Sequence, residues 1–151
     1  MGIIVSVNLS DKKGVVKKPV AEVRLMPGRG VLGDAHAGPG DRQVSLLMIE
    51  DIEKAGAAAE CGVSEVGDGL GPGSFAENLT TRGLDLGSLR LGDQLEIASG
   101  IRLRVTRIGK ECHRPCAIFY KTGNCIMPER GIFCEPLDPG VVRPGARIDK
   151  N

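Results

Sequence analysis

The stretch Gln94–Ile108, with the sequence QLEIASGIRLRVTRI, decides the fold class of this chain. In its second half the apolar residues Ile101, Leu103 and Val105 alternate with polar ones, which is the two-residue period of a strand with one buried face. The first five residues have the same character, and only Ser99-Gly100 separates the two runs. A connection of this kind closes a β-hairpin. The stretch therefore predicts an antiparallel pair of strands.

Further strands are predicted on both sides of this hairpin. Ile3 to Val7 and Arg42 to Met48 are predicted to be strands, and the second carries the apolar residues Val44, Leu46 and Leu47. Ala21, Val23 and Leu25 alternate with polar neighbours, as half-buried strand residues do. The 22 Gly and 9 Pro lie in many turns, which favours short strands joined by tight loops.

One segment has the pattern of a helix. Ile49 to Glu60 has two acidic residues in its first turn, apolar residues at helical spacing, and Cys61-Gly62 as a stop. A parallel α/β sheet would need a helix after most of its strands. Many strands with one principal helix and few short helices predict a mainly β, barrel-like domain instead.

Composition limits the classes of function. A chain of 151 residues is expected to form one domain over residues 1–151. Its net charge is only +1, and three Phe, one Tyr and no Trp offer few rings for stacking bases, so nucleic-acid binding is not expected. It has neither a secretory signal pattern nor an apolar run of about 18 residues, so we expect no membrane span and a cytoplasmic location.

The odd number of cysteines, five, favours reduced thiols over a disulfide framework. Cys112 and Cys116 lie four residues apart among Lys110, His113 and Arg114. A thiol in such a cationic setting ionises easily, and the thiolate attacks electrophiles and binds soft metals. Because Pro115 precedes Cys116 shortly after a strand, we expect this thiol in a loop or first helical turn at the mouth of the barrel.

Two alternatives remain for the cysteines. Cys112 and Cys116, with Cys125 or Cys134, could supply four sulfurs to a structural zinc ion, although Cys125 and Cys134 form no second close pair. Small buried hydrophobic residues are the other alternative, and it is preferred for Cys61 and Cys134.

Two loops carry other candidate residues. His36 follows Asp34 in a turn-rich stretch, where a hydrogen-bonded structural pair is the simpler interpretation. The stretch from Gly71 to Thr80 joins glycines to Glu77 and Asn78, and it would also suit a plain turn into a strand. No phosphate-binding glycine motif of a nucleotide site is present.

Five short motifs follow one another along the chain: GDAH at 33–36, RQVSL at 42–46, GSFAENL at 73–79, LGD at 91–93 and the late Pro115-Cys116. Together they resemble the MOSC family, found at the C-terminus of molybdenum-cofactor sulfurases and as small bacterial proteins. The resemblance extends from about Gly33 to Ile148. It implies a MOSC-type β-barrel fold and work on the molybdenum cofactor, with Cys116 as the characteristic cysteine. The family's usual Gly-Glu-Asn is Ala76-Glu77-Asn78 here.

The resemblance implies a role for each candidate. Cys116 would carry a persulfide or contact molybdenum, and Cys112 would either resolve that persulfide or tune it. Candidate catalytic residues are thus Cys116, Cys112 and His113; candidate molybdopterin-binding residues are Lys110, Arg114, Arg42, His36, Asn78 and Glu77. Sulfur would come from a separate cysteine desulfurase, with no pyridoxal phosphate bound covalently here. Other expected partners are cofactor-biosynthesis proteins or molybdoenzymes.

Two other functions follow from the same resemblance. The chain would be a molybdenum-cofactor-dependent reductase of N-hydroxylated compounds, served by separate electron donors, or a carrier without catalytic activity. In each case the pterin is expected between the 33–38, 73–78 and 110–116 loops, with the basic side chains on its phosphate.

Overall fold

The computed structural model describes residues 2–11, 17–35, 37–38, 40, 43–53, 72–73, 77–98, 100–108 and 131–151. Its elements run along the chain as follows: β1 Gly2–Leu9, β2 Lys18–Val20, β3 Val23–Met26, β4 Gly30–Val31, β5 Val44–Met48, β6 Leu79–Arg82, the 3₁₀ turn η1 Leu86–Ser88, β7 Gln94–Ile97, β8 Ile101–Ile108, β9 Ile132–Pro136, β10 Gly140–Val142 and β11 Arg147–Lys150.

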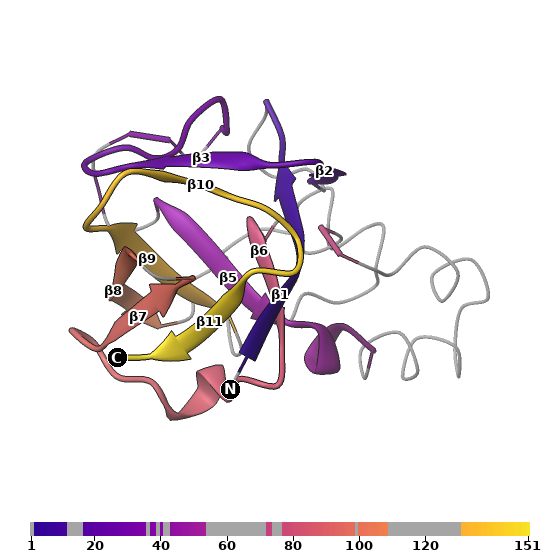
Figure 1. Cartoon of the computed structure of the whole chain (residues 1–151), viewed down its shortest axis with the longest axis vertical. Coiled ribbons are helices and arrows are strands. Elements are labelled where there is room, and N and C mark those ends of the chain that lie inside the picture. Colours follow the sequence, from indigo (N-terminus) through magenta and orange to yellow (C-terminus); the bar gives the residue numbers. More distant parts are fainter. Residues whose placement is uncertain are drawn as a thin grey trace, which may run out of the picture.

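Seven strands form a closed β-barrel (Figure 1). Their order is β11-β7-β8-β9-β5-β6-β1, and pairing of Gly2 with Ile148 joins β1 back to β11. Strand β2 extends this sheet beside β1, and β10, β3 and β4 make a second, three-stranded sheet. Strands β5 and β6 pair in parallel, whereas the other described pairings are antiparallel.

The predicted hairpin is confirmed as β7 and β8. Ile97 pairs with Ile101, so the connection is three residues rather than the predicted two. Ala98 lies outside the strand with a φ of 55°, in the left-handed region that three-residue hairpin loops use. The alternation of apolar and polar side chains does not reveal the sign of φ. The sequence pattern therefore extends the strand by one residue, to Ala98.

The other predicted elements are largely confirmed. Strand β1 contains Ile3 to Val7, β5 begins at Val44 rather than Arg42, and β3 begins at Val23 rather than Ala21. Residues 49–53 are helical, as predicted, and the rest of the predicted helix to Glu60 lies outside the described residues. In the described part of the chain, no helix has both the length and the apolar character that a membrane span needs.

The core fills the barrel interior and extends to the smaller sheet. Leu46, Leu79 and Leu103 are fully buried there, and Leu25 of β3 belongs to the same cluster. The smaller sheet lies across one side of the barrel in Figure 1. Gly140 of β10 permits this contact, because a Cβ at that position would stand 2.5 Å from Cδ1 of Ile101.

Candidate functional site

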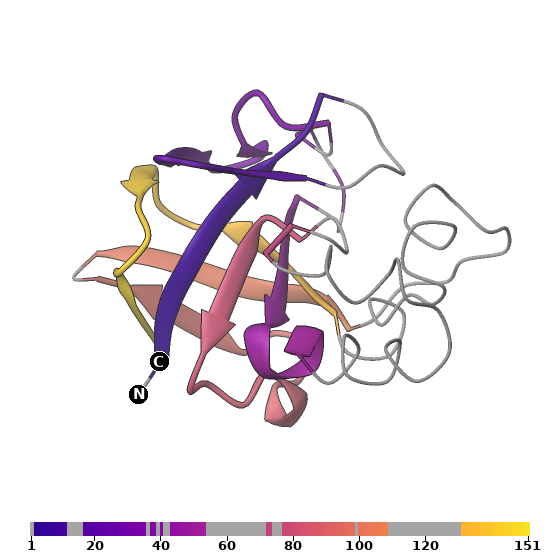
Figure 2. The same cartoon turned by 90° about the vertical axis from the view of Figure 1, so that its right-hand side faces the viewer.

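Three neighbouring strands carry polar residues on the face that points away from the barrel core. Figure 2 shows β1 (indigo), β6 (pink) and β5 (magenta) side by side. On each strand these polar residues alternate with core residues, and they are nevertheless buried. We call this set, with the loop residues bonded to it, the polar frame: Ser6, Asn8, Lys17, Asp34, Ser45, Glu77, Asn78 and Thr80.

Asn78 joins the start of β6 to both neighbouring strands. Its Oδ1 accepts hydrogen bonds from Ser45 N at 3.0 Å and Ser45 Oγ at 3.1 Å. Its Nδ2 donates to the carbonyl of Asn8 at 3.2 Å. With 1% exposure, this side chain is committed to the protein and links β5 to β1 through β6.

Glu77 holds the turn before β6. Its Oε2 accepts from the N–H of Gly73 at 3.0 Å and from the hydroxyl of Thr80 at 2.7 Å. Asn8 Nδ2 donates to Thr80 Oγ1 and to the Glu77 carbonyl. The Glu77 carboxylate is fully buried, so its hydrogen bonds fix Gly73 and Thr80 from inside the protein.

Lys17 connects this turn to the loop at 33–38. Its Nζ lies 2.7 Å from Asp34 Oδ1, and both side chains have 0% exposure. The same oxygen accepts from Ser10 N at 3.0 Å, while the main chain of Lys17 donates to the Gly73 carbonyl at 2.8 Å. Gly73 has a φ of +88°, and a Cβ there would stand 2.1 Å from the Lys17 carbonyl oxygen. Two of the three predicted cofactor loops therefore meet at Lys17.

The strand ends on either side of the third predicted loop lie close by in the sheet. Ile108 pairs with Ile132, Ile132 with Leu46, and Leu46 with Leu79. This row crosses four adjacent strands, so Ile132 lies two strand spacings, roughly 10 Å, from Leu79. Leu79 directly follows Asn78. The chain therefore leaves and re-enters the barrel for the segment 109–131 near the polar frame.

Gln43 lies immediately before β5 and is 4% exposed. Its side-chain oxygen Oε1 is buried and has no hydrogen-bond partner. In the sequence, Gln43 directly follows Arg42, a predicted phosphate-binding residue. Two residues further on is Ser45, which is hydrogen-bonded to Asn78.

The structure describes two of the nine predicted site residues, Glu77 and Asn78. The other seven lie outside the described residues: His36, Arg42, Lys110, Cys112, His113, Arg114 and Cys116. The chain on either side of His36 is described; there Ala35 N donates to the Ser10 carbonyl, and Ala37 N donates to the Asp34 carbonyl.

Cys134 confirms the prediction of a packed thiol. It is fully buried on β9 between Val44 and Val105, and burial raises the pKa of this thiol far above its ordinary value. Cys61 and Cys125 lie outside the described residues. Within the part that is described, no group of three His, Cys, Asp or Glu side chains is placed to hold a metal ion.

Sequence reasoning missed Lys17 and Asn8. Lys17 is one of four lysines between residues 12 and 18, and no local pattern separates it from its neighbours. Asn8 had a signal, because Ser6, Asn8 and Ser10 alternate with apolar residues and so share one face of β1. That polar face would ordinarily be taken as solvent-exposed.

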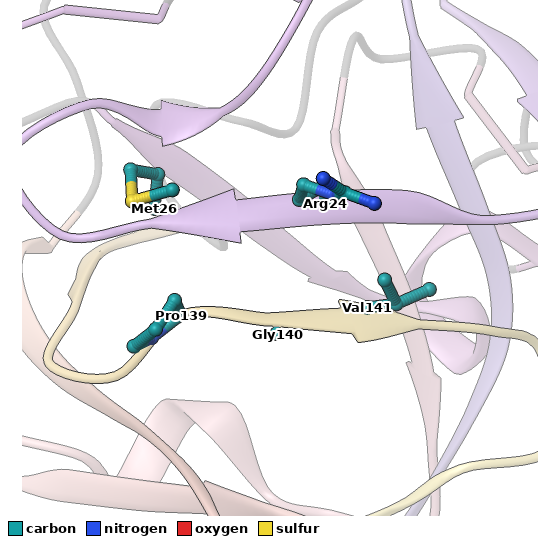
Figure 3. Close-up of a pocket in the computed structure, with 5 residues that line it drawn as sticks. All are labelled: Arg24, Met26, Pro139, Gly140 and Val141. Atoms are coloured by element: carbon teal, nitrogen blue, oxygen red, sulfur yellow. The ribbon is translucent and has the colours of Figure 1, made fainter.

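A shallow hollow of about 270 Å³ lies between β3 and β10 (Figure 3). Among described residues it is lined by Arg24, Met26, Pro139, Gly140 and Val141. Arg24 is the single titratable side chain in that set, so this lining offers no acid–base pair or nucleophile.

Comparison with protein families gives a match to the MOSC domain. The model of the MOSC domain matches residues 33–149, which is most of the chain. The match begins at the loop that carries Asp34 and ends in β11. No curated protein sequence matches the chain.

Solved structures share the fold. The YuaD protein from Bacillus subtilis superposes with a TM-score of 0.75 at 23% identity, covering 98% of this chain and 94% of that one. YiiM from Geobacillus stearothermophilus gives a TM-score of 0.72 at 22% identity, covering 100% of this chain and 75% of that one. YiiM from Escherichia coli gives 0.70 at 20% identity, with 100% and 70% covered.

Proposed function

The chain belongs to the MOSC domain family, and from that membership we propose that it binds the molybdenum cofactor and handles sulfur through Cys116. Domains of this family are generally linked to that cofactor. The pterin phosphate is bound by Lys110, Arg114 and Arg42, with His36 at the edge of the same site. Each of these contacts is a charge-assisted or polar hydrogen bond to an anion.

One observation supports the proposal: described residues of two predicted loops meet in the polar frame, and the strand ends that flank the third loop lie nearby. Lys17 joins the 33–38 loop to the 72–73 turn through Asp34 and Gly73. The pairing of Ile132 with Leu46 brings the end of the cysteine-bearing segment to the strand next to β6. Such convergence of loops on a rigid barrel is the usual construction of a binding site.

Glu77 and Asn78 serve this site by holding backbone. Their exposures are 0% and 1%, and their described hydrogen bonds go to protein atoms. Asn78 therefore holds β5 and β1 beside the start of β6, and Glu77 holds Gly73 at the start of the predicted 73–78 loop. Removing either leaves buried donors or acceptors unpaired, so the loop would lose its shape.

The described residues fit a pterin at one atom in particular. The unpartnered Oε1 of Gln43 is a hydrogen-bond acceptor, and a pterin offers ring N–H donors; Arg42, the preceding residue in the sequence, supplies a positive charge for the phosphate. When bound, the cofactor supplies a molybdenum centre capable of redox chemistry.

The sulfur step is an exchange at Cys116. The Cys116 thiolate attacks the terminal sulfur of a persulfide on a cysteine desulfurase. A new sulfur–sulfur bond forms on Cys116, the bond on the donor breaks, and the donor cysteine leaves as a thiolate. No oxidant or reductant is consumed. Lys110, His113 and Arg114 favour the attacking thiolate by their charge, and Cys112 is close enough in sequence to resolve the product.

The test compares Cys116→Ser with Cys134→Ala. Protein purified from a molybdate-replete host is assayed for bound molybdenum and pterin, and for cyanide-labile sulfur after incubation with a cysteine desulfurase and cysteine. We expect the parent protein and Cys134→Ala to gain labile sulfur and Cys116→Ser to gain none while it retains pterin. A parent protein that holds neither pterin nor labile sulfur would contradict the proposal. Stoichiometric molybdenum without labile sulfur would favour the carrier or the reductase.

A further inference from the structure

Three described side chains have a buried oxygen without a hydrogen-bond partner: Gln43, Glu50 and Thr81. A buried polar atom of this kind destabilises the folded protein, because it gives up water and gains nothing. Each therefore needs a physical explanation.

The main chain of Gln43 is closely packed against strand β4. Gly30 of β4 has a φ of +92°, and a Cβ there would lie 2.3 Å from the Gln43 carbonyl oxygen. Strand β4 thus packs directly on the main chain of Gln43, where only glycine fits. The backbone on the other side enters β5 at Val44, which is fully buried.

The alternation of β5 places Gln43 with Ser45. Val44 and Leu46 belong to the barrel core, so the residues between and before them lie on the opposite face. Ser45 on that face is hydrogen-bonded to Asn78. Gln43 is therefore the member of the polar face whose amide oxygen is not used by the protein.

The other two oxygens have different settings. Thr81 is on the core side of β6 with Leu79, and its strand neighbours are Ile4 and Met48. Glu50 uses its second carboxylate oxygen to accept from Gly83 N at 2.9 Å. Of the three, only Gln43 adjoins a predicted cofactor-binding residue, Arg42.

We propose that Gln43 is a specificity-determining residue that recognises the heterocyclic ring of a bound pterin by a hydrogen bond. Its Oε1 accepts a hydrogen bond from an N–H on the aminopyrimidinone edge of the ring. This inference rests on the proposed function and assigns one group within it. An ionised phosphate has hydrogen-bond acceptors and no donor, so it cannot bond to the amide oxygen of Gln43. This oxygen therefore favours the pterin ring over the phosphate group.

The experiment separates recognition of the ring from folding. Neopterin, which has the ring but no phosphate, sulfur or metal, is titrated by fluorescence into the parent protein, Gln43→Met and Thr81→Val. Inorganic phosphate is titrated by calorimetry as the second probe. Both substitutions remove an unpartnered buried oxygen, so both should raise the melting temperature, by roughly 2–4 °C.

Only Gln43→Met should weaken neopterin binding, by about tenfold, which is the loss expected for one hydrogen bond of about 1.4 kcal/mol. Its phosphate affinity should match that of the parent protein, and Thr81→Val should match in both titrations.

Equal neopterin affinity for Gln43→Met and the parent protein would overturn the assignment. So would a parallel loss of phosphate affinity, or a parent protein that does not bind neopterin. The proposed function is decided separately, by bound molybdenum and by labile sulfur on Cys116. Its failure and the failure of this inference are therefore distinguishable.

Discussion

The two sides of the barrel use charged residues in different ways. On the polar frame, Lys17 and Asp34 form an ion pair with 0% exposure, and its atoms connect loops. On the side made by β7, β8 and β11, Arg102 and Asp138 pair at 2.8 Å with exposures of 47% and 29%, and Lys150 lies 3.5 Å from Asp93 near solvent. The buried ion pair thus joins loops of the polar frame, whereas the pairs on the other side lie at the protein surface.

This contrast predicts which polar substitutions strongly destabilise the folded protein. Water can replace a lost partner on the β7–β8–β11 side, so a lost exposed pair costs little. In the polar frame a lost partner leaves a buried group that water does not reach, and the cost is several times larger. Substitutions on both sides test this contrast directly.

The largest effect is expected for Lys17→Met, which leaves the buried Asp34 carboxylate without its cation. Loss of one member of a buried pair should lower the free energy of unfolding by about 3–5 kcal/mol, measured by urea denaturation at pH 7. Lys18→Met, at the exposed neighbouring position, is the control and should change it by less than about 0.5 kcal/mol. Adding Asp34→Asn to Lys17→Met should recover part of the loss. Equal stability of the two single variants would refute the buried pair.

Gly73→Ala should have the next largest effect. The new Cβ would combine left-handed strain with a clash against the Lys17 carbonyl, so a loss of about 2–4 kcal/mol is expected in the same denaturation assay. Gly33→Ala is the matched control, because Gly33 has a φ of +84° with nothing within 4 Å. It should lose only about 1–2 kcal/mol, from strain alone. If both variants lost the same amount, the close approach at Gly73 would be wrong.

A pH-dependent effect is expected at Cys134. Burial raises its pKa in the folded protein, so its contribution to stability is complete below the pKa of the unfolded thiol and falls as pH rises above it. With an unfolded thiol near pH 8.5, the parent protein should lose about 2 kcal/mol more than Cys134→Ala between pH 7 and pH 10. Denaturation curves of both proteins under reducing conditions measure this. Parallel pH profiles would mean that Cys134 ionises in the folded state.

The smallest effect is expected for Asp138→Asn on the exposed side. The hydrogen bond from the Arg102 side chain is the main reason that the pKa of Asp138 is lowered. Stability from this pair is therefore present at neutral pH and lost as pH falls through the lowered value. The variant should melt slightly below the parent protein at pH 7, the difference should shrink as the pH falls through the lowered pKa of Asp138, and added salt should reduce it at pH 7. A loss as large as that of Lys17→Met would erase the contrast between the two sides.

The local elements of this protein could be predicted from the amino-acid sequence. Alternation placed β7 and β8, the apolar runs placed β1 and β5, and the acidic first turn marked the start of the helix at Ile49. Cys134 was correctly predicted to be a buried core residue, because free thiols are usually buried. The motifs from Gly33 to Cys116 indicated the family that the domain match shows. These features depend on residues close in sequence, where periodicity reports burial.

Contacts between residues far apart in the sequence became known from the three-dimensional structure. The closure of β1 on β11, the parallel pairing of β5 with β6, and the choice of Lys17 among four lysines follow from no local pattern. Asn8 and Gln43 are polar residues that a sequence places at the surface, and the fold buries them. The physical reason is that strand periodicity says which side chains share a face. What covers that face depends on packing between segments far apart in the chain.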